Sequence, residues 1–254
     1  MKASSKRLAA WALRFVPIGL VPIETMLRLS QRITAALAGA LFLREWRFQV
    51  RGRPRFFKHQ INLARWALEP SRWAFTARGV YARERMFEGC KVLDLCCGDG
   101  SYSYLFFSDI AARIDAVDND PHAIDYARRI NGAASISYHQ MDIVNQPLPD
   151  SGYDVVVWNA AICYFSEAEI RNILRKIVAA GSAQVRLAGM LPKANGWIDH
   201  KTEFQDCQAV ERLLREFFEE VSVRDVNEAP TITFYFQASH PAINPVGRPE
   251  VSVE

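Results

Sequence analysis

The stretch VLDLCCGDG at residues 92–100 decides the fold. An apolar run with one acid, Asp94, leads directly into a turn that holds two cysteines and the glycines Gly98 and Gly100. Because glycine has no Cβ, its backbone adopts dihedral angles that other residues avoid and approaches a ligand closely. In an open parallel sheet, ligands bind where the strands end. The stretch therefore predicts a buried strand followed by a ligand-binding turn.

The residues after this turn alternate between strand-like and helix-like patterns. Apolar runs typical of buried strands occur at residues 112–118, 136–143, 153–161 and 183–190, with amphipathic helical patterns between most of them. Two further strand-like runs near the end of the chain are joined only by NEAP at 227–230, which favours an antiparallel hairpin at one edge. The order predicts an α/β fold, a Rossmann-like, seven-stranded, mostly parallel sheet with helices on both faces.

Three regions follow from these patterns. Residues 1–85 read as helix without any strand-period segment, so we expect a helical N-terminal extension or cap. Residues 86–240 form the sheet domain. Residues 241–254 include prolines and are expected to be an irregular tail.

The net charge of +3 hides an uneven distribution. Residues 1–60 contain twelve Lys or Arg and only two acids, whereas the rest of the chain is acidic. Such a basic arm favours an anionic partner: a membrane surface, nucleic acid or the acidic body of the chain itself. Trp11, Phe15, Leu27 and Leu29 alternate with basic residues as in an interfacial helix, so peripheral membrane contact is one expectation. Nucleic acid is the least favoured partner.

The cysteines and the N-terminal residues are used to predict the cellular compartment of the protein. Five cysteines with no CxxC pair argue against a disulfide framework and a structural zinc site, and adjacent Cys96 and Cys97 are expected to be small packing residues. The N-terminus loosely resembles a signal peptide, but Arg14 interrupts it. Its uncharged stretches are about half the roughly 20 residues that span a bilayer. We expect a cytoplasmic protein, either free or peripheral to the membrane.

The ligand of the turn can be narrowed by elimination. Only one glycine of a GxGxxG dinucleotide fingerprint is matched, and a GxxxxGK[ST] phosphate loop is absent. Asp94 and Asp99 flank the turn and would repel a pyrophosphate that has no compensating cation. The same acids suit a ligand that carries positive charge, such as S-adenosylmethionine.

At this point VLDLCCGDG resembles the D-x-G-x-G-x-G first motif of class I S-adenosylmethionine-dependent methyltransferases, with Cys96 where the first glycine is usual. The resemblance covers about residues 86–190. It implies that Asp94, Cys96, Gly98 and Gly100 cradle the methionine end of the cofactor.

Later landmarks of that family fall in order along the chain. Asp118, with Asn119 beside it, ends the second strand where the ribose hydroxyls bind. Asp142 and the backbone of Ile143 stand where the adenine is recognised. YDVVVWNAAICYF at 153–165 resembles the fourth motif, which places Asn159 toward the cofactor and the reacting methyl group.

Catalytic residues are sought at the end of the fourth strand and after the fifth. Methyl transfer depends on orientation, and a general base is needed only when the acceptor must lose a proton. Many relatives carry a histidine near Tyr164, and this chain does not, so His200, assisted by Asp199, is the candidate base; a loop histidine without a chemical role is the alternative. Asn159 and Tyr164 are the other candidates. Asn159 stands where metal-dependent relatives have an acid, so no catalytic metal is expected.

Upstream, residues 69–86 interleave aromatic and basic side chains. Arg78 or Tyr81 could touch the methionine carboxylate or an acidic acceptor, or the segment could be a basic helix face with aromatic core anchors. The expected activity is metal-independent methylation of an oxygen or nitrogen atom of a small molecule, with glycans and lipid-linked molecules among the candidates. A nucleotide-dependent oxidoreductase and a non-catalytic scaffold that docks through its basic arm stay open as alternatives.

Overall fold

The computed structural model describes residues 73–194, 200–228 and 231–242, together with five helical residues between 26 and 33. The chain divides into two compact units, residues 1–72 and 73–254. Within the described ranges, no helix has both the length and the apolar character needed to cross a membrane. Most of the basic arm, and the tail from residue 243 onward, lie outside the described residues, so their expected roles stay predictions.

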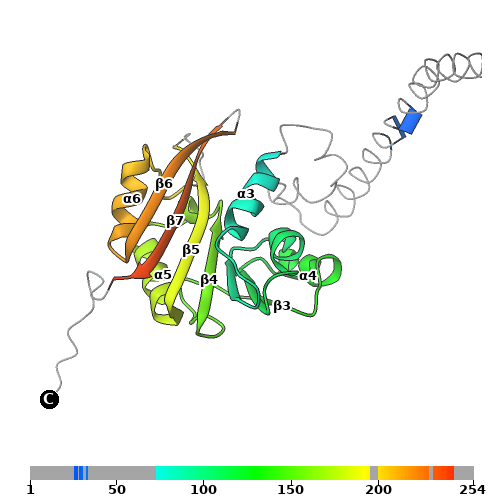
Figure 1. Cartoon of the computed structure of the whole chain (residues 1–254), viewed down its shortest axis with the longest axis horizontal. Coiled ribbons are helices and arrows are strands. Elements are labelled where there is room, and N and C mark those ends of the chain that lie inside the picture. The colour runs from blue at the N-terminus through cyan, green and yellow to red at the C-terminus, as the bar shows by residue number, and fades with distance from the viewer. Residues whose placement is uncertain are drawn as a thin grey trace, which may run out of the picture. The chain divides into compact units, whose positions relative to one another are not determined.

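One seven-stranded sheet organises the second unit, in the order β3-β2-β1-β4-β5-β7-β6 (Figure 1). The pairs among β3, β2, β1, β4 and β5 are parallel, and β7 runs antiparallel to both β5 and β6. This confirms the predicted mostly parallel sheet with a hairpin at one edge. The strands are β1 Lys91–Leu95, β2 Arg113–Asp118, β3 Ile136–Gln140, β4 Tyr153–Asn159, β5 Gly181–Pro192, β6 Phe218–Glu228 and β7 Thr231–Pro241.

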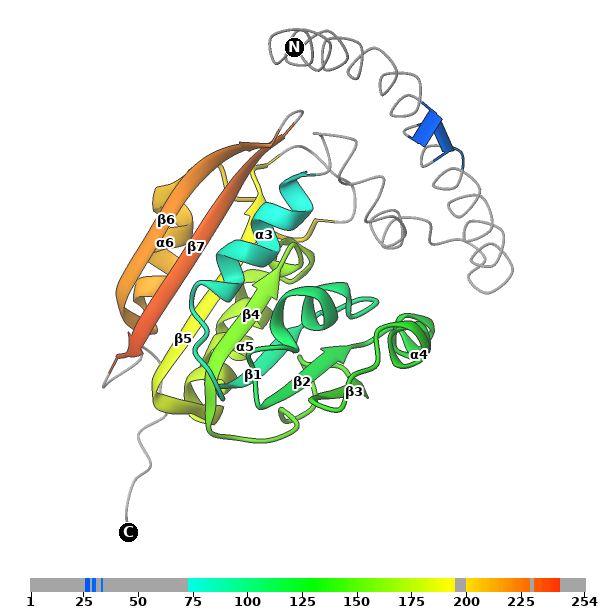
Figure 2. The ribbon, with the colours of Figure 1, turned by 45° about the vertical axis from the view of Figure 1, so that its right-hand side comes forward.

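Helices cover both faces of the sheet (Figure 2). The helices α3 Trp73–Arg83 and α4 Pro121–Ile130 contribute side chains to one buried cluster, and α5 Glu167–Ala180 and α6 Cys207–Arg215 contribute to the other. Two short helical turns follow strands, the π-helical turn Ser103–Phe107 after β1 and the 3-10 turn Ile162–Tyr164 after β4. The sheet is therefore the middle of three layers.

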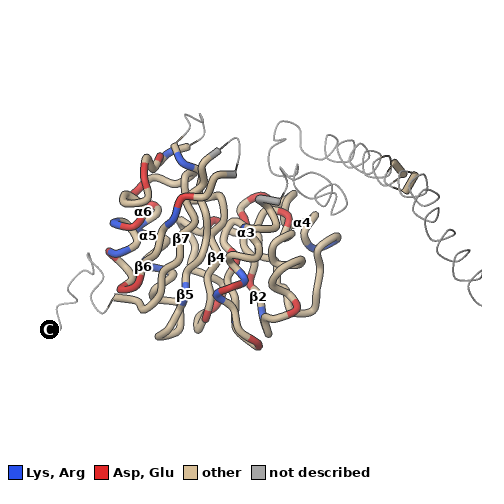
Figure 3. The backbone as a smooth tube through the Cα atoms, turned by 45° about the horizontal axis from the view of Figure 1, so that its top comes forward, with Lys and Arg blue, Asp and Glu red and all other residues tan. Residues whose placement is uncertain are grey.

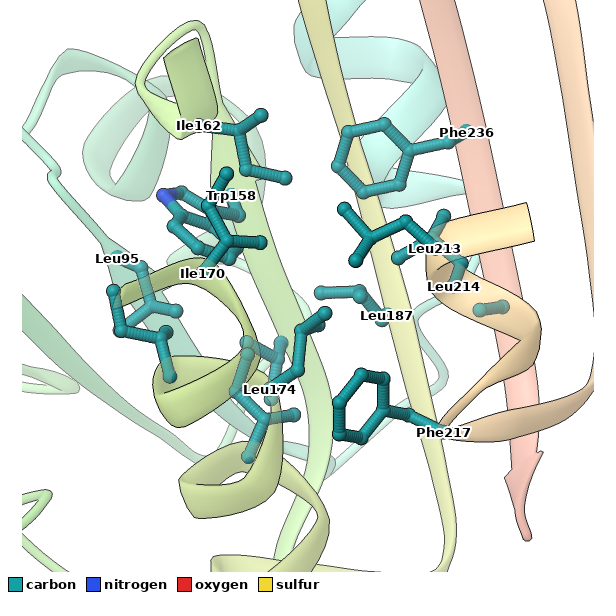
Figure 4. Close-up of a cluster of buried hydrophobic side chains, with 14 of the residues drawn as sticks. Leu95, Trp158, Ile162, Ile170, Leu174, Leu187, Leu213, Leu214, Phe217 and Phe236 are labelled. Atoms are coloured by element: carbon teal, nitrogen blue, oxygen red, sulfur yellow. The ribbon is translucent and has the colours of Figure 1, made fainter. Parts of the chain in front are cut away.

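The larger buried cluster lies between the sheet and the helices α5 and α6. The helix α5 begins at a capping box between Ser166 and Glu169, as the sequence predicts. Its buried residues recur with helical spacing and so form one apolar face. Figure 4 shows this face meeting side chains from β1, β4, β5, β7, α6 and the adjoining turns, among them Leu95, Trp158, Ile162, Leu187, Leu213, Leu214, Phe217 and Phe236. α5 is thus a rigid part of the core.

Ion pairs lie along the outer surface of this helical layer, where Figure 3 shows positive and negative positions side by side on α5 and α6. Arg171 pairs with Glu167 one turn earlier on α5 and with Glu216 just after α6. Exposed pairs of this kind contribute little to stability individually. The Arg171–Glu216 pair connects α5 to the residue that follows α6.

The domain boundary at residue 86 stays a prediction, and the compact unit that contains the sheet also includes the helix α3, from Trp73 onward. The helix α3 packs on the segment after β1, where Phe75 stacks on Tyr102 with ring centroids 4.2 Å apart. At Gly79, an added Cβ would lie only 2.5 Å from the Phe106 ring. This helix therefore belongs to the sheet's unit because its contacts are with that unit, although its local pattern matches the helical extension.

Candidate functional site

Three polar side chains share one face of the sheet at the carboxyl ends of its central strands. The register pairs Asp94 of β1 with Ala116 of β2 and with Val157 of β4. Because side chains alternate between faces along a strand, Asp118 and Asn159, two residues further on, point to the same face as Asp94. The candidate site is built from these three positions and the turns that follow them.

Asp94 is buried in the core beneath the turn. Only 2% of its surface is exposed, and the Ser103 hydroxyl donates to its Oδ2 at 2.6 Å. Burial raises the pKa of the Asp94 carboxyl to about 7, and the charges of Asp118 and Asp99 add to the shift. A carboxyl in this environment favours a positively charged ligand, because a cation compensates the cost of ionising it.

The turn after β1 bends through the left-handed region three times, at Cys96 (φ 56°), Gly98 (φ 56°) and Gly100 (φ 72°). Gly100 also has no room for a side chain, since an added Cβ would lie 2.2 Å from the Tyr138 hydroxyl. Cys96 adopts a conformation that costs a non-glycine residue about 1–3 kcal/mol. The positive φ gives the physical reason why glycine is usual at this position in the methyltransferase motif.

Asp118 joins the end of β2 to this turn. Its Oδ2 accepts the Gly98 N–H at 2.9 Å, and its Oδ1 accepts the Asp120 N–H at 2.9 Å. Burial raises the pKa of Asp118 above its usual value. Asn119, the other residue predicted to bind the ribose, is exposed beside it. Each carboxylate oxygen retains a second lone pair, so Asp118 can also accept ligand hydroxyls.

A second set of hydrogen bonds, which the sequence did not predict, braces the far side of the turn. Asn131, just after α4, donates its side-chain amide to the Asp99 carbonyl at 2.8 Å. The Tyr138 hydroxyl donates in turn to the Asn131 carbonyl at 2.8 Å. The Asp99 carboxylate accepts from the Ser101 N–H and hydroxyl, and burial raises its pKa to about 6. In the sequence, Tyr138 is a single tyrosine within the short strand β3, and nothing in that local pattern shows that it contacts the glycine turn.

The loop between β3 and β4 carries the predicted adenine contacts. Its start is tied to β2, because the Met141 N–H donates to the Asp118 carbonyl at 2.8 Å. Asp142 is exposed, and its carboxylate accepts from the Asn145 amide at 2.7 Å and the Val144 N–H at 2.9 Å. These bonds lower the pKa of Asp142, the Asn145 amide having the largest effect. Ile143 is buried. Contact with adenine stays a prediction for both.

Asn159, at the end of β4, is only 8% exposed, and its side-chain nitrogen has no hydrogen-bond partner among the residues that the structure describes. A buried donor without a partner costs about 1–3 kcal/mol, which a ligand acceptor would recover. The next residue, Ala160, is a second non-glycine residue in the left-handed region, with φ 56°. Strain of this kind collects at ligand sites, and here it occurs at the ends of two adjacent strands.

The structure brings the other two predicted catalytic residues together. The rings of Tyr164 and His200 meet edge to face with centroids 5.3 Å apart. His200 is held there by its neighbours, since the Lys201 and Thr202 N–H groups both donate to the Cys163 carbonyl. Both rings therefore lie beside the segment that follows Asn159. Asp199, expected to assist His200, lies outside the described residues.

Tyr81 is an aromatic anchor of α3. It is buried, packs edge-on against Tyr235 with ring centroids 4.8 Å apart, and carries the Arg224 guanidinium 5.1 Å from its ring centroid. Burial raises the pKa of Tyr81 to about 12. Tyr81 is therefore an aromatic core anchor, the second of the two roles considered for it, and is not available to a ligand carboxylate. Arg78, on the same helix, is half-exposed.

The donor set fits S-adenosylmethionine. Buried acids match its positive charges, Asp118 matches a ribose, and the glycine turn admits close backbone approach. Among the described residues, no group of three or more His, Cys, Asp or Glu side chains could hold a metal ion. All five cysteines are free thiols, and Cys97 is buried, as expected of a packing residue.

Comparison with known proteins identifies similar methyltransferases. Residues 92–181 match the family described as Methyltransferase domain. An uncharacterized methyltransferase of Mycobacterium tuberculosis and its counterpart in Mycobacterium bovis are 29% identical over 126 residues. That match covers 48% of this chain and 62% of the relatives' length.

Solved structures share the fold at lower identity. The N-methyltransferase NodS from Bradyrhizobium japonicum, in complex with S-adenosyl-L-homocysteine, superposes with a TM-score of 0.57 at 16% identity, covering 70% of this chain and 91% of NodS. A SAM-dependent methyltransferase from Aquifex aeolicus gives a TM-score of 0.51 at 20% identity, covering 68% of this chain and 94% of that one.

Proposed function

The chain carries a class I S-adenosylmethionine-dependent methyltransferase domain, and from this premise we propose that it methylates an oxygen or nitrogen atom of a small-molecule acceptor without a metal. The bound cofactor supplies an electrophilic methyl group on a positively charged sulfur. The observation that carries the proposal is the arrangement of Asp94, Asp118 and Asn159 on one face of the sheet at the ends of adjacent strands.

Binding is the main task of the residues around the glycine turn. Asp94 is a buried carboxyl and Asp99 a partly buried one, and a cation favours the ionised form of both. Asp118 presents its remaining lone pairs to the ribose hydroxyls. Asp142 and the Ile143 N–H recognise the adenine. Asn159 donates its unpartnered amide to the cofactor or the acceptor.

Orientation of the acceptor falls to the segment after β4. Tyr164 contacts the acceptor, and His200 accepts a proton from it when the reacting group is a hydroxyl or an ammonium. The two rings, in edge-to-face contact, would keep the acceptor atom aligned with the methyl group, and alignment supplies much of the acceleration of such a displacement. Strand β4 ends in an amide, Asn159, and this supports a metal-independent reaction.

The acceptor is proposed only as a class. A small molecule, with glycans and lipid-linked molecules among the candidates, is supported by the basic and apolar sequence of residues 1–60. NodS is named as an N-methyltransferase, but a shared fold at 16% identity does not extend its acceptor to this chain.

Calorimetric titration of the full chain with S-adenosylmethionine, S-adenosylhomocysteine and NAD tests the proposal. We expect micromolar binding of the first two, strong weakening in Asp118→Ala, and no change in Asp125→Ala, an exposed aspartate on α4. Binding of NAD alone would overturn the proposal in favour of an oxidoreductase. Binding of none of the three would point to a scaffold protein.

A further inference from the structure

An ammonium group holds the loop that carries the predicted adenine contacts. Lys176 of α5 donates from Nζ to the carbonyls of Ile143, Val144 and Gln146 at 2.9, 2.7 and 2.9 Å. A lysine ammonium has three donors, so all three are used. The loop has no regular structure to pair these carbonyls, and the lysine supplies the pairing that secondary structure would otherwise give.

Lys176 lies on α5, a helix that is held in place by the core. Its helix buries Ile173, Leu174 and Ile177 in the core, so Lys176 reaches the loop from a fixed position. One turn earlier, the Asn172 amide donates to the Val144 carbonyl at 3.2 Å. Two side chains of α5 thus form hydrogen bonds to the same short segment, residues 143–146.

The hydrogen bonds around Lys176 extend to Asp142 through Val144. Val144 is bound on both sides, its carbonyl by Lys176 and its N–H by the Asp142 carboxylate. The two charges also interact electrostatically, because the Lys176 charge helps to lower the pKa of Asp142. Burial lowers the pKa of Lys176, and the Asp142 charge opposes that shift. Moving the lysine would therefore move the carboxylate.

We propose that Lys176 is a positioning residue that holds residues 142–146 in the conformation that recognises the adenosine half of the cofactor. The inference rests on the proposed function. Lys176 acts through the loop and does not touch the cofactor. A compact ammonium can point at three converging carbonyls, whereas the planar guanidinium of arginine donates in a fixed fork, so arginine is a poor substitute here.

Titration with two ligands tests this role. S-adenosylhomocysteine contains the whole cofactor skeleton, and 5′-methylthioadenosine contains its adenosine half. We expect Lys176→Met, which keeps an unbranched apolar stem but removes the ammonium, to weaken both ligands by the same factor, about tenfold. Lys176→Arg should recover only part of the loss. Arg175→Met, at the exposed neighbouring position, should bind both ligands like wild type.

Coupling to Asp142 separates positioning from a general loss of stability. If Lys176 acts through the loop, Lys176→Met combined with Asp142→Asn should cost clearly less than the sum of the two single changes. Amide hydrogen exchange should become faster in residues 142–146 of Lys176→Met, with β1 and β4 unchanged. Should Lys176→Met fail to fold, Asn172→Leu is measured in its place, with a smaller loss of the same pattern expected.

The outcomes are distinct. Wild type that binds S-adenosylhomocysteine, with Lys176→Met binding it within about twofold of wild type, would overturn this inference and leave the proposed function standing. Additive losses with Asp142→Asn would also overturn it. A wild type that binds neither ligand would overturn the proposed function and this inference with it.

Discussion

The carboxylate of Asp118 accepts the N–H of Gly98 at 2.9 Å, so the last residue of β2 fixes the turn that follows β1. The same carboxylate also accepts the Asp120 N–H, which starts the approach to α4. A residue predicted to bind ribose is therefore part of the framework as well. The predicted ribose contact and the conformation of the turn therefore depend on the same side chain.

Replacing Asp118 by asparagine tests that coupling. The amide has one acceptor oxygen, so one of the two N–H groups loses its acceptor, and we expect a loss of about 1–3 kcal/mol in the free energy of unfolding. Urea unfolding of the apo protein measures this. Asp125→Asn on the surface of α4 is the matched control and should be neutral. A variant as stable as wild type would show that the Asp118 hydrogen bonds do not hold the turn.

The buried acids predict an unusual pH dependence. Asp94, with a folded-state pKa of about 7, retains its proton where the unfolded chain has already released it. Between about pH 4, the ordinary aspartate range, and the folded-state value, the folded chain binds more protons, so its stability falls as pH rises. Asp99, at about 6, acts in the same direction. We expect the melting temperature to decline across this window.

The variant Asp94→Asn isolates this contribution. Its melting temperature should fall less steeply than that of wild type between pH 5 and pH 8, and thermal melts in a buffer series give both slopes. S-adenosylmethionine should reduce the wild-type slope, because a cation favours the ionised carboxyls. Parallel curves for wild type and variant would contradict a raised pKa at Asp94.

Much of the fold could be predicted from the sequence because it is encoded locally. The capping box at Ser166, the alternation of apolar runs and the short link at 227–230 each fixed an element that the structure contains. The turn at the end of β1 was predictable because Gly98 and Gly100 meet a backbone requirement within one turn, whereas its ligand stays a prediction.

Contacts between distant segments could not be predicted in the same way. Lys176 looks like an ordinary polar residue of an amphipathic helix, and only the fold shows that it meets carbonyls some thirty residues earlier. Asn131 and Tyr138 brace the glycine turn for the same reason. The helix α3 matched the helical extension because its pattern does not reveal what its apolar face contacts.

The two adjacent cysteines should respond oppositely to glycine. Cys96 has φ 56°, so glycine there removes strain of about 1–3 kcal/mol while costing about 0.5–1 kcal/mol in chain entropy. We expect Cys96→Gly to be at least as stable as wild type. Cys97 is buried without a positive φ, so Cys97→Gly should lose about 1–2 kcal/mol. Urea unfolding of both variants checks the order, and the reverse order would contradict strain at Cys96.

Asn159 offers the sharpest separation of stability from function. The nitrogen of its buried amide has no hydrogen-bond partner among the described residues, so removing the side chain removes an unsatisfied donor along with some packing. We expect Asn159→Ala to keep the free energy of unfolding within about 1 kcal/mol of wild type, because these two effects offset. Binding of S-adenosylhomocysteine should nevertheless weaken about tenfold, because the amide's proposed partner is the ligand.

Urea unfolding and calorimetric titration of the same preparation give both quantities. Asn145→Ala is the matched control: its amide donates to Asp142 in an exposed turn, so removing it should cost little stability and less affinity than the Asn159 change. If Asn159→Ala binds S-adenosylhomocysteine like wild type, the amide serves the acceptor alone. If Asn159→Ala also has a much lower free energy of unfolding than wild type, the amide has a structural partner. The unpartnered amide would then no longer support a ligand site at the end of β4.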